Sequence, residues 1–233
     1  MNVTLSKLGR IALDLIYPPR CVLCGAGGAM LCTSCEASLP RARRPRCERC
    51  WLPKAEAAPC RHCLERPLAL DAVRALYRYE EGPRRLVHAL KYRDQSALAS
   101  LMGQAMASLA REEGLAADLV VPVPLAGARA RQRGYNQAAL LAKAIASEIE
   151  APIVEALRRR RSAPPQAQSA TAEARRRNVE SAFAARRPEL IAAKRVLLVD
   201  DVVTTGATLD ACARVLRSAG AREVMAITFA RED

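Results

Sequence analysis

Aromatic side chains are scarce in this sequence, which has one Trp, two Phe and five Tyr among its 233 residues. A hydrophobic core must therefore be built mainly from Leu, Val, Ile and Ala. Long apolar runs are also missing, and none could span a bilayer. The opening residues, MNVTLSKLGR, lack the apolar segment and cleavage site of a signal peptide. We therefore expect a cytoplasmic protein with no membrane span.

The positive charge is large and unevenly distributed. Lys and Arg number 37 against 24 Asp and Glu, which gives a formal net charge of +13. Residues 156–187 hold nine arginines and two acids, or +7, and residues 1–66 hold eleven basic and five acidic residues, or +6. The remaining segments, 67–155 and 188–233, are nearly neutral. Such localised charge indicates a polyanionic partner.

Eight of the nine cysteines form four Cys-x-x-Cys pairs: Cys21 and Cys24, Cys32 and Cys35, Cys47 and Cys50, Cys60 and Cys63. Two such pairs can close a tetrahedral site of four thiolates, so we expect two structural zinc ions. Short intervals favour pairing in sequential order, and interleaved pairing stays open. Disulfides are disfavoured because a cytoplasmic protein is kept reduced. The ninth, Cys212, is interpreted as a small buried hydrophobe.

Apolar spacing predicts an α/β protein with two parts, a helix and cysteine module over residues 1–66 and a larger domain over 67–233. Helices are expected at 3–16, 83–91, 95–112, 136–148 and 207–218, and strands at 72–79, 118–123, 153–156, from 195, and at 222–229. Because strands and helices alternate, the sheet should be mainly parallel, with helices on its faces.

The most informative segment is residues 195–209, RVLLVDDVVTTGATL. An apolar strand ends in Asp200 and Asp201, and a Thr- and Gly-rich loop then leads into a helix. Free backbone N–H groups at a helix N-terminus bind anions, whereas the two acids suit a diol or a cation. No Lys follows the loop as in a P-loop, and no G-x-G-x-x-G opens the helix. Phosphate, diol and metal together describe a ribose 5-phosphate.

This segment resembles the phosphoribosyl pyrophosphate (PRPP) signature of type I phosphoribosyltransferases. The resemblance implies that Asp200 and Asp201 bind the ribose hydroxyls, in company with Mg²⁺. It also implies that the following loop holds the 5-phosphate through Val203, Thr204, Thr205, Gly206, Ala207 and Thr208.

Nearly the whole chain resembles the ComF family, which is linked to competence and DNA uptake in bacteria. The matching motifs are His88-Ala-Leu-Lys-Tyr92, Val121-Pro-Val-Pro-Leu125, Arg133-Gly-Tyr-Asn-Gln137 and Arg175-Arg-Arg-Asn178. The implied architecture is a double zinc ribbon followed by a type I phosphoribosyltransferase fold. The resemblance also places Lys91 and Arg133 at the pyrophosphate, and Arg175 in a catalytic loop.

Residues 157–181 have the composition of a flexible loop, rich in Arg and Pro and poor in apolar residues. Within it, Arg158 to Arg161 and Arg175 to Arg177 could close over PRPP or contact single-stranded DNA. A solvated linker is the alternative interpretation of the same composition.

We therefore expect a PRPP-binding protein of the ComF type that acts on incoming single-stranded DNA, with competence proteins as further candidate partners. Pentosyl transfer from PRPP, with release of pyrophosphate, is the favoured activity, and Asp200, Asp201, Arg133 and Arg175 are its candidate catalytic residues. Two other functions stay open: a small-molecule phosphoribosyltransferase of nucleotide salvage and an inactive PRPP-binding scaffold. The acceptor of the phosphoribosyl group is not determined by the sequence.

Overall fold

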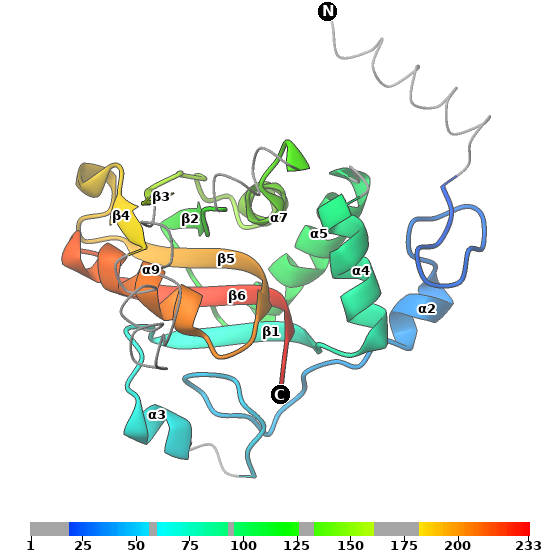
Figure 1. The fold of residues 1–233 in the computed structure, drawn as a ribbon, viewed down its shortest axis with the longest axis horizontal. Coiled ribbons are helices and arrows are strands. Elements are labelled where there is room, and N and C mark those ends of the chain that lie inside the picture. Colours follow the sequence, from blue (N-terminus) through cyan, green and yellow to red (C-terminus); the bar gives the residue numbers. More distant parts are fainter. Residues whose placement is uncertain (1–18, 56–59, 93–95, 126–132, 161–181) are drawn as a thin grey trace, which may run out of the picture.

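The computed structural model describes residues 19–55, 60–92, 96–125, 133–160 and 182–233 (Figure 1). The helix expected at 3–16 lies outside these residues. None of the described helices is long and apolar enough to cross a membrane.

Four parallel strands form the central sheet, in the spatial order β1-β6-β5-β2 (Figure 1). Their bounds are Ala72–Arg78 for β1, Leu119–Pro122 for β2, Arg195–Val203 for β5 and Glu223–Arg231 for β6. Almost every strand residue is buried, as expected when both faces of a parallel sheet are covered. The prediction of a mainly parallel α/β fold is confirmed.

Helices cover both faces of this sheet. On one face lie α4 (Glu81–Tyr92), α5 (Ser96–Glu112) and α7 (Gln137–Glu148), and α9 (Ala207–Ser218) packs on the other. Strand alternation divides the core accordingly. Leu197 and Val199 join the cluster of the first face, whereas Val196 and Leu198 join the cluster beneath α9.

Two short strands are the main departure from the expected elements. Leu157–Arg159 (β3) pairs antiparallel with Phe183–Ala185 (β4), where we expected the start of a flexible loop. Leu157 and Phe183 are buried in the α9-side cluster, and this burial fixes both strands. The expected strand at 153–156 is reduced to one parallel bridge between Val120 and Ile153. A short 3-10 helix, Pro188–Leu190 (η1), leads toward β5.

The cysteine module contains two short helices, α2 (Thr33–Ala37) and α3 (Arg61–Glu65). Its first half packs beside α4: Arg85 donates to the carbonyl of Val22 at 3.0 Å, and a Cβ added to Gly82 would lie 2.7 Å from Leu39. The second half contacts the carboxyl end of the sheet and the C-terminus, so the two halves support different parts of the larger domain (Figure 1). The boundary proposed at residue 66 stays a prediction.

Candidate active site and metal centres

The two acids of the PRPP-like segment lie at the carboxyl end of β5, on opposite faces of the sheet because side chains alternate along a strand. Asp201 is 5 % exposed and forms an ion pair with Lys91 at the end of α4. Asp200 points toward the α9 side, remains partly exposed, and its Oδ1 accepts a hydrogen bond of 2.9 Å from the backbone N–H of Asp201. The edge of the sheet thus presents one partly open carboxylate and one that is already paired.

Desolvation by the surrounding protein raises the pKa of Asp200 well above its usual range, and the neighbouring charge of Asp201 raises it further. Lys91 acts in the opposite direction. A cation or a donating hydroxyl bound beside Asp200 would favour the ionised carboxylate and lower this pKa again.

The loop after β5 supplies the features of an anion site. Thr204 and Thr205 are exposed, and Gly206 stands at the N-cap of α9 with φ of 79°. An L side chain rarely adopts this left-handed conformation, so glycine is the residue suited to this turn. Gly206 has no side chain to cap the helix, and the N–H of Ala207 makes only a long hydrogen bond of 3.4 Å to Oγ1 of Thr205, within the loop itself. The N-terminus of α9 thus faces the loop.

Three motifs that are distant in sequence meet near Asp201. The hydroxyl of Tyr135 donates to the carbonyl of Leu90 at 2.5 Å, which links the start of α7 to the end of α4 next to Lys91. The side-chain amide of Asn136 donates to the carbonyl of Val123 at 3.0 Å, and its Oδ1 caps α7. The motifs around Lys91, Val123 and Tyr135 therefore form one structure at the edge where Asp200 and Asp201 lie.

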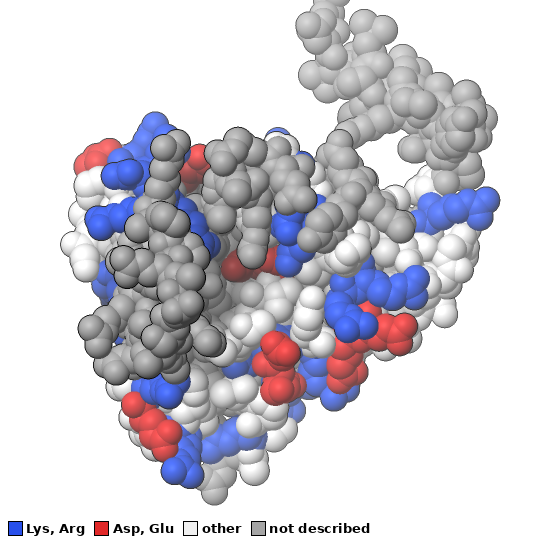
Figure 2. Space-filling model, in the orientation of Figure 1, with Lys and Arg blue, Asp and Glu red and all other residues white. Residues whose placement is uncertain are grey.

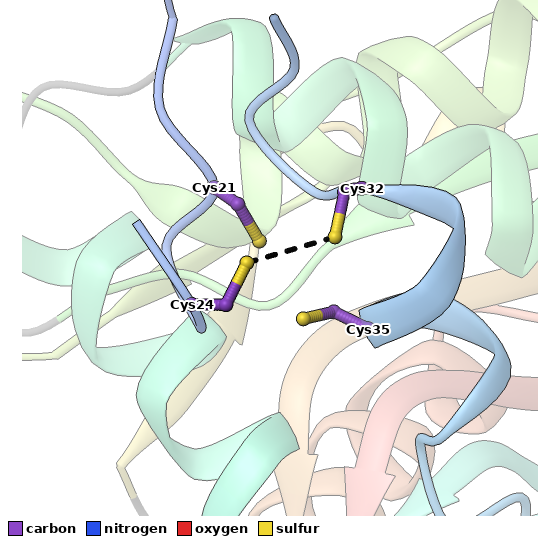
Figure 3. Close-up of side chains that lie close together, drawn as sticks. All are labelled: Cys21, Cys24, Cys32 and Cys35. Atoms are coloured by element: carbon purple, nitrogen blue, oxygen red, sulfur yellow. Dashed lines mark hydrogen bonds between the residues drawn. The ribbon is translucent and has the colours of Figure 1, made fainter. Parts of the chain in front are cut away.

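The eight paired cysteines form two groups of four: Cys21, Cys24, Cys32 and Cys35, and Cys47, Cys50, Cys60 and Cys63. Within each group all sulfurs lie within 4.8 Å of one another. The Sγ atoms of Cys24 and Cys32 are 3.7 Å apart (Figure 3), and those of Cys50 and Cys60 are 3.4 Å apart. Sulfurs bound to one zinc at about 2.3 Å are about 3.8 Å apart, so both groups fit tetrahedral zinc.

One thiol of each group is poised to ionise. Burial opposes ionisation of Cys47, but backbone N–H groups outweigh it and hold the pKa of this thiol at about 6. The same balance holds the pKa of Cys21 at about 6. Thiolate is the form that binds zinc, so each group offers a ligand in the correct state near neutral pH.

Comparison with known families gives two matches. The phosphoribosyl transferase domain matches residues 135–233, and the double zinc ribbon domain matches residues 12–64.

Relatives extend the similarity along the chain. It is 32 % identical over 220 residues to the DNA utilization protein YhgH of Salmonella typhimurium, covering 90 % of this chain and 96 % of the relative. The Competence protein F of Haemophilus influenzae is 30 % identical, covering 86 % and 90 %. The chain belongs to the ComF family. A third member, the Competence protein ComFC of Bacillus subtilis, is 26 % identical, covering 86 % and 84 %.

Membership confirms the expected architecture of the ComF chain, a double zinc ribbon before a type I phosphoribosyltransferase fold. The cysteine groups support two structural zinc ions, with the first two pairs in one group and the last two in the other. Burial separates them: every cysteine of the second group is buried, whereas Cys24 is exposed and Cys32 and Cys35 are partly exposed.

Several predicted PRPP contacts of this ComF protein stay predictions. The side chain of Val203 is 2 % exposed and its carbonyl accepts from Glu232, so any contact with phosphate would come from other backbone atoms. Arg133 donates to Gln137 at 3.2 Å, at the start of α7. Arg161 and Arg175 to Arg177 lie outside the described residues.

The polar contacts that dock the second zinc ribbon on the larger domain were not predicted from the sequence. Trp51 is 1 % exposed and donates through Nε1 to the carbonyl of Ala75 at 3.1 Å. Arg46 holds the Asp233 carboxylate with two hydrogen bonds of 2.7 Å, and Arg231 donates to the carbonyl of Cys50 at 2.8 Å. No local pattern identifies these partners, because they lie more than 20 residues apart in sequence.

Proposed function

We propose that this ComF-family protein binds PRPP at the carboxyl end of β5 and transfers its phosphoribosyl group to an acceptor during the handling of incoming single-stranded DNA. One observation carries the PRPP site. Two adjacent acids near the end of β5 are followed, two residues on, by the exposed Thr204 and Thr205 and by Gly206 at the N-terminus of α9. Groups suited to bind a diol and groups suited to bind a phosphate thus lie next to each other.

The reaction asks for little acid–base catalysis. The bond from ribose C1 to the pyrophosphate oxygen breaks, pyrophosphate leaves with the electron pair, and the acceptor bonds to C1. Asp200 and Asp201 would fix the ribose hydroxyls while positive charge develops on the ring, and the 204–208 loop would hold the 5-phosphate. Mg²⁺ bound with PRPP would neutralise the leaving pyrophosphate.

The PRPP site is tested by replacing Asp200 and Asp201 together with Asn. We expect this variant to lose binding of Mg²⁺·PRPP, measured by calorimetry, because neutral amides cannot replace carboxylates as partners of the ribose diol and metal. The variant should still fold, since relief of the repulsion between Asp200 and Asp201 offsets the loss of the ion pair between Asp201 and Lys91.

Glu189→Gln is the matched control, because it removes an exposed carboxylate on η1. Unchanged PRPP affinity in the double variant would refute the site. Binding without any release of pyrophosphate would identify an inactive scaffold instead of a transferase. Turnover with free nucleobases as acceptors would identify a salvage enzyme.

The proposed role in DNA handling is supported by the names of the relatives and by exposed positive charge. Relatives are called competence and DNA utilization proteins, and Arg158, Arg159 and Arg160 are exposed at β3. Arg186 and Arg187 are exposed directly after β4, and Figure 2 shows Lys and Arg side chains gathered over these two strands. An exposed basic edge of this kind suits a phosphate backbone.

We expect replacement of Arg158 to Arg161 by Ala to flatten the salt dependence of single-stranded DNA binding. Each phosphate contact contributes about 0.7 to the slope of log K against log salt, so loss of four contacts lowers the slope by about 3. Fluorescence anisotropy with a labelled oligonucleotide measures this slope. Alanines at the exposed Arg43, Arg61 and Arg66 of the cysteine module are the control. An unaltered slope in the first variant would exclude this segment as the DNA contact.

A further inference from the structure

Arg231, the last residue of β6, is a buried arginine that the proposed chemistry does not use. It is 4 % exposed, and its guanidinium lies between two parts of the molecule. Nη1 donates to the carbonyl of Cys50 at 2.8 Å, and Nη2 lies 3.5 Å from the carbonyl of Thr204. One side chain therefore contacts both Cys50 of the second cysteine group and Thr204. Thr204 is the first residue of the 204–208 loop, called the phosphate loop below because we propose that it holds the 5-phosphate.

The Cys50 carbonyl belongs to a tight turn between the zinc ligands. The backbone N–H of Trp51 donates to the carbonyl of Cys47 at 2.9 Å, and that of Cys47 donates to the carbonyl of Leu52 at 2.9 Å. Trp51 itself has φ of 65°, in the left-handed region. A metal that holds the thiolates of Cys47 and Cys50 thus also fixes the carbonyl to which Arg231 donates.

The loop side of this contact is equally well defined. Val203 pairs with Arg231 across the sheet, and the carbonyl of Val203 accepts from the N–H of Glu232 at 2.9 Å. Thr204 is the next residue and opens the loop that leads to Gly206. The start of the phosphate loop is thus fastened to the end of β6, with Arg231 at the junction.

The nearby carboxylate of Asp233 is bound mainly by another arginine, so the hydrogen-bond acceptors of Arg231 are the two carbonyls. The carboxylate of Asp233 is held by Arg46 at 2.7 Å through two hydrogen bonds, whereas it lies 4.0 Å from Nε of Arg231. A buried cation with mainly carbonyl partners is weak evidence for stability, and it points to a role in geometry.

We propose that Arg231 is a positioning residue that couples the second zinc group to the phosphate loop, so that zinc bound by Cys47, Cys50, Cys60 and Cys63 sets the affinity for PRPP. This inference rests on the proposed PRPP site. The first group packs against the first half of α4, at Gly82 and Arg85, so any effect of it on the site would take a different route. By linkage, PRPP bound at the loop must also stabilise the second zinc group.

The test compares Arg231→Met with Arg46→Met in the zinc-loaded chain. Both arginines are 4 % exposed and donate to carbonyls of the second ribbon, but only Arg231 also faces the phosphate loop. Calorimetry gives the Kd for Mg²⁺·PRPP, and elemental analysis gives the zinc content. We expect Arg231→Met to bind PRPP about tenfold more weakly and Arg46→Met to remain within about twofold of the wild type.

Trp51, the only tryptophan of the chain, follows Cys50 and gives a second readout. PRPP should shift its fluorescence in the wild type and in Arg46→Met but not in Arg231→Met. If Arg231→Met fails to fold, Arg231→Lys serves as the second variant. It keeps the buried charge, so it should retain two zinc ions, yet one ammonium group cannot span both carbonyls and PRPP should bind weakly again.

Equal Kd values in the wild type and both Arg231 variants would overturn the coupling and leave the PRPP site intact. Equal losses in Arg231→Met and Arg46→Met would also overturn it, because docking of the ribbon would then explain both. If the wild type itself failed to bind Mg²⁺·PRPP, the proposed function and this inference would fall together.

Discussion

Neighbouring aspartates differ in partners because a strand points them to opposite faces. Asp201 turns toward α4 and meets Lys91, whereas Asp200 turns toward the α9 side. If Lys91 contacts pyrophosphate, as the resemblance to the ComF family implies, its ion pair with Asp201 must break. Lys91 would then exchange a carboxylate for a diphosphate when PRPP binds, and Asp201 would become free for the ribose.

A second acid at the residue scale gives a prediction about pH and stability. Arg195 holds the pKa of Asp118 at about 2, below its usual range, chiefly through side-chain hydrogen bonds with a shortest distance of 2.8 Å. Because the folded pKa is lowered, the ionised carboxylate stabilises the fold above about pH 4. That contribution is lost as the pH falls toward 2.

We therefore expect Asp118→Asn to be less stable than the wild type at pH 6, with a difference that shrinks below pH 4. Urea unfolding at several pH values measures it, and taking the difference cancels effects shared by both proteins, such as protonation of the zinc ligands. A constant difference across this range would contradict the assignment to Asp118.

At the scale of elements, the helix layer beside the candidate site depends on close packing of α5 against α7. A Cβ added to Gly103 in α5 would lie 2.4 Å from the Cβ of Ala144 in α7 and 3.1 Å from the carbonyl oxygen of Leu141. Glycine is thus needed here for space, since its φ is not in the left-handed region. The approach matters because α7 carries Tyr135 and Asn136 at its start.

We expect Gly103→Ala to lower the free energy of unfolding by about 1–3 kcal/mol, because the helices must move apart to admit the methyl group. Thermal or urea unfolding measures the loss. Ala144→Gly in the same chain removes the opposing methyl group and should recover part of it. If the double variant were no better than the sum of the single variants, helix contact would not be the cause.

At the scale of the whole molecule, the two zinc ribbons pack on different elements of the larger domain. The first packs on the first half of α4, at Gly82 and Arg85, and the second contacts the end of β6 through Arg231. The ribbons also differ in exposure, since the second group is fully buried and the first is not. The first group should therefore lose its zinc before the second group does.

We expect a chelator to remove zinc in two phases, the faster from the first group because solvent reaches Cys24. Cys24→Ser should abolish or further accelerate the fast phase and leave the slow one, whereas Cys60→Ser should affect the slow phase. The fluorescence of Trp51 should follow the slow phase alone. A single phase in the wild type, or a Trp51 signal in the fast phase, would contradict this order.

The sequence predicts most of this architecture because its signals are local. A continuous apolar run, two acids and a glycine predict strand β5, the loop after it and α9. The Cys-x-x-Cys spacing identifies the cysteine pairs. Strands β3 and β4 escaped prediction, since three residues are too few to show alternation and their stability comes from burying Leu157 and Phe183 in a distant cluster.

By itself the sequence determined the fold class, the family, the four Cys-x-x-Cys pairs and the position of the two acids, because each depends on residues close together in the chain. Only the tertiary structure decided that Lys91 pairs with Asp201, which cysteine pairs share a site, and that Arg231 joins Cys50 to Thr204. These contacts link segments as much as 181 residues apart, and only the packing of the sheet, its helices and the ribbons brings them within hydrogen-bonding reach.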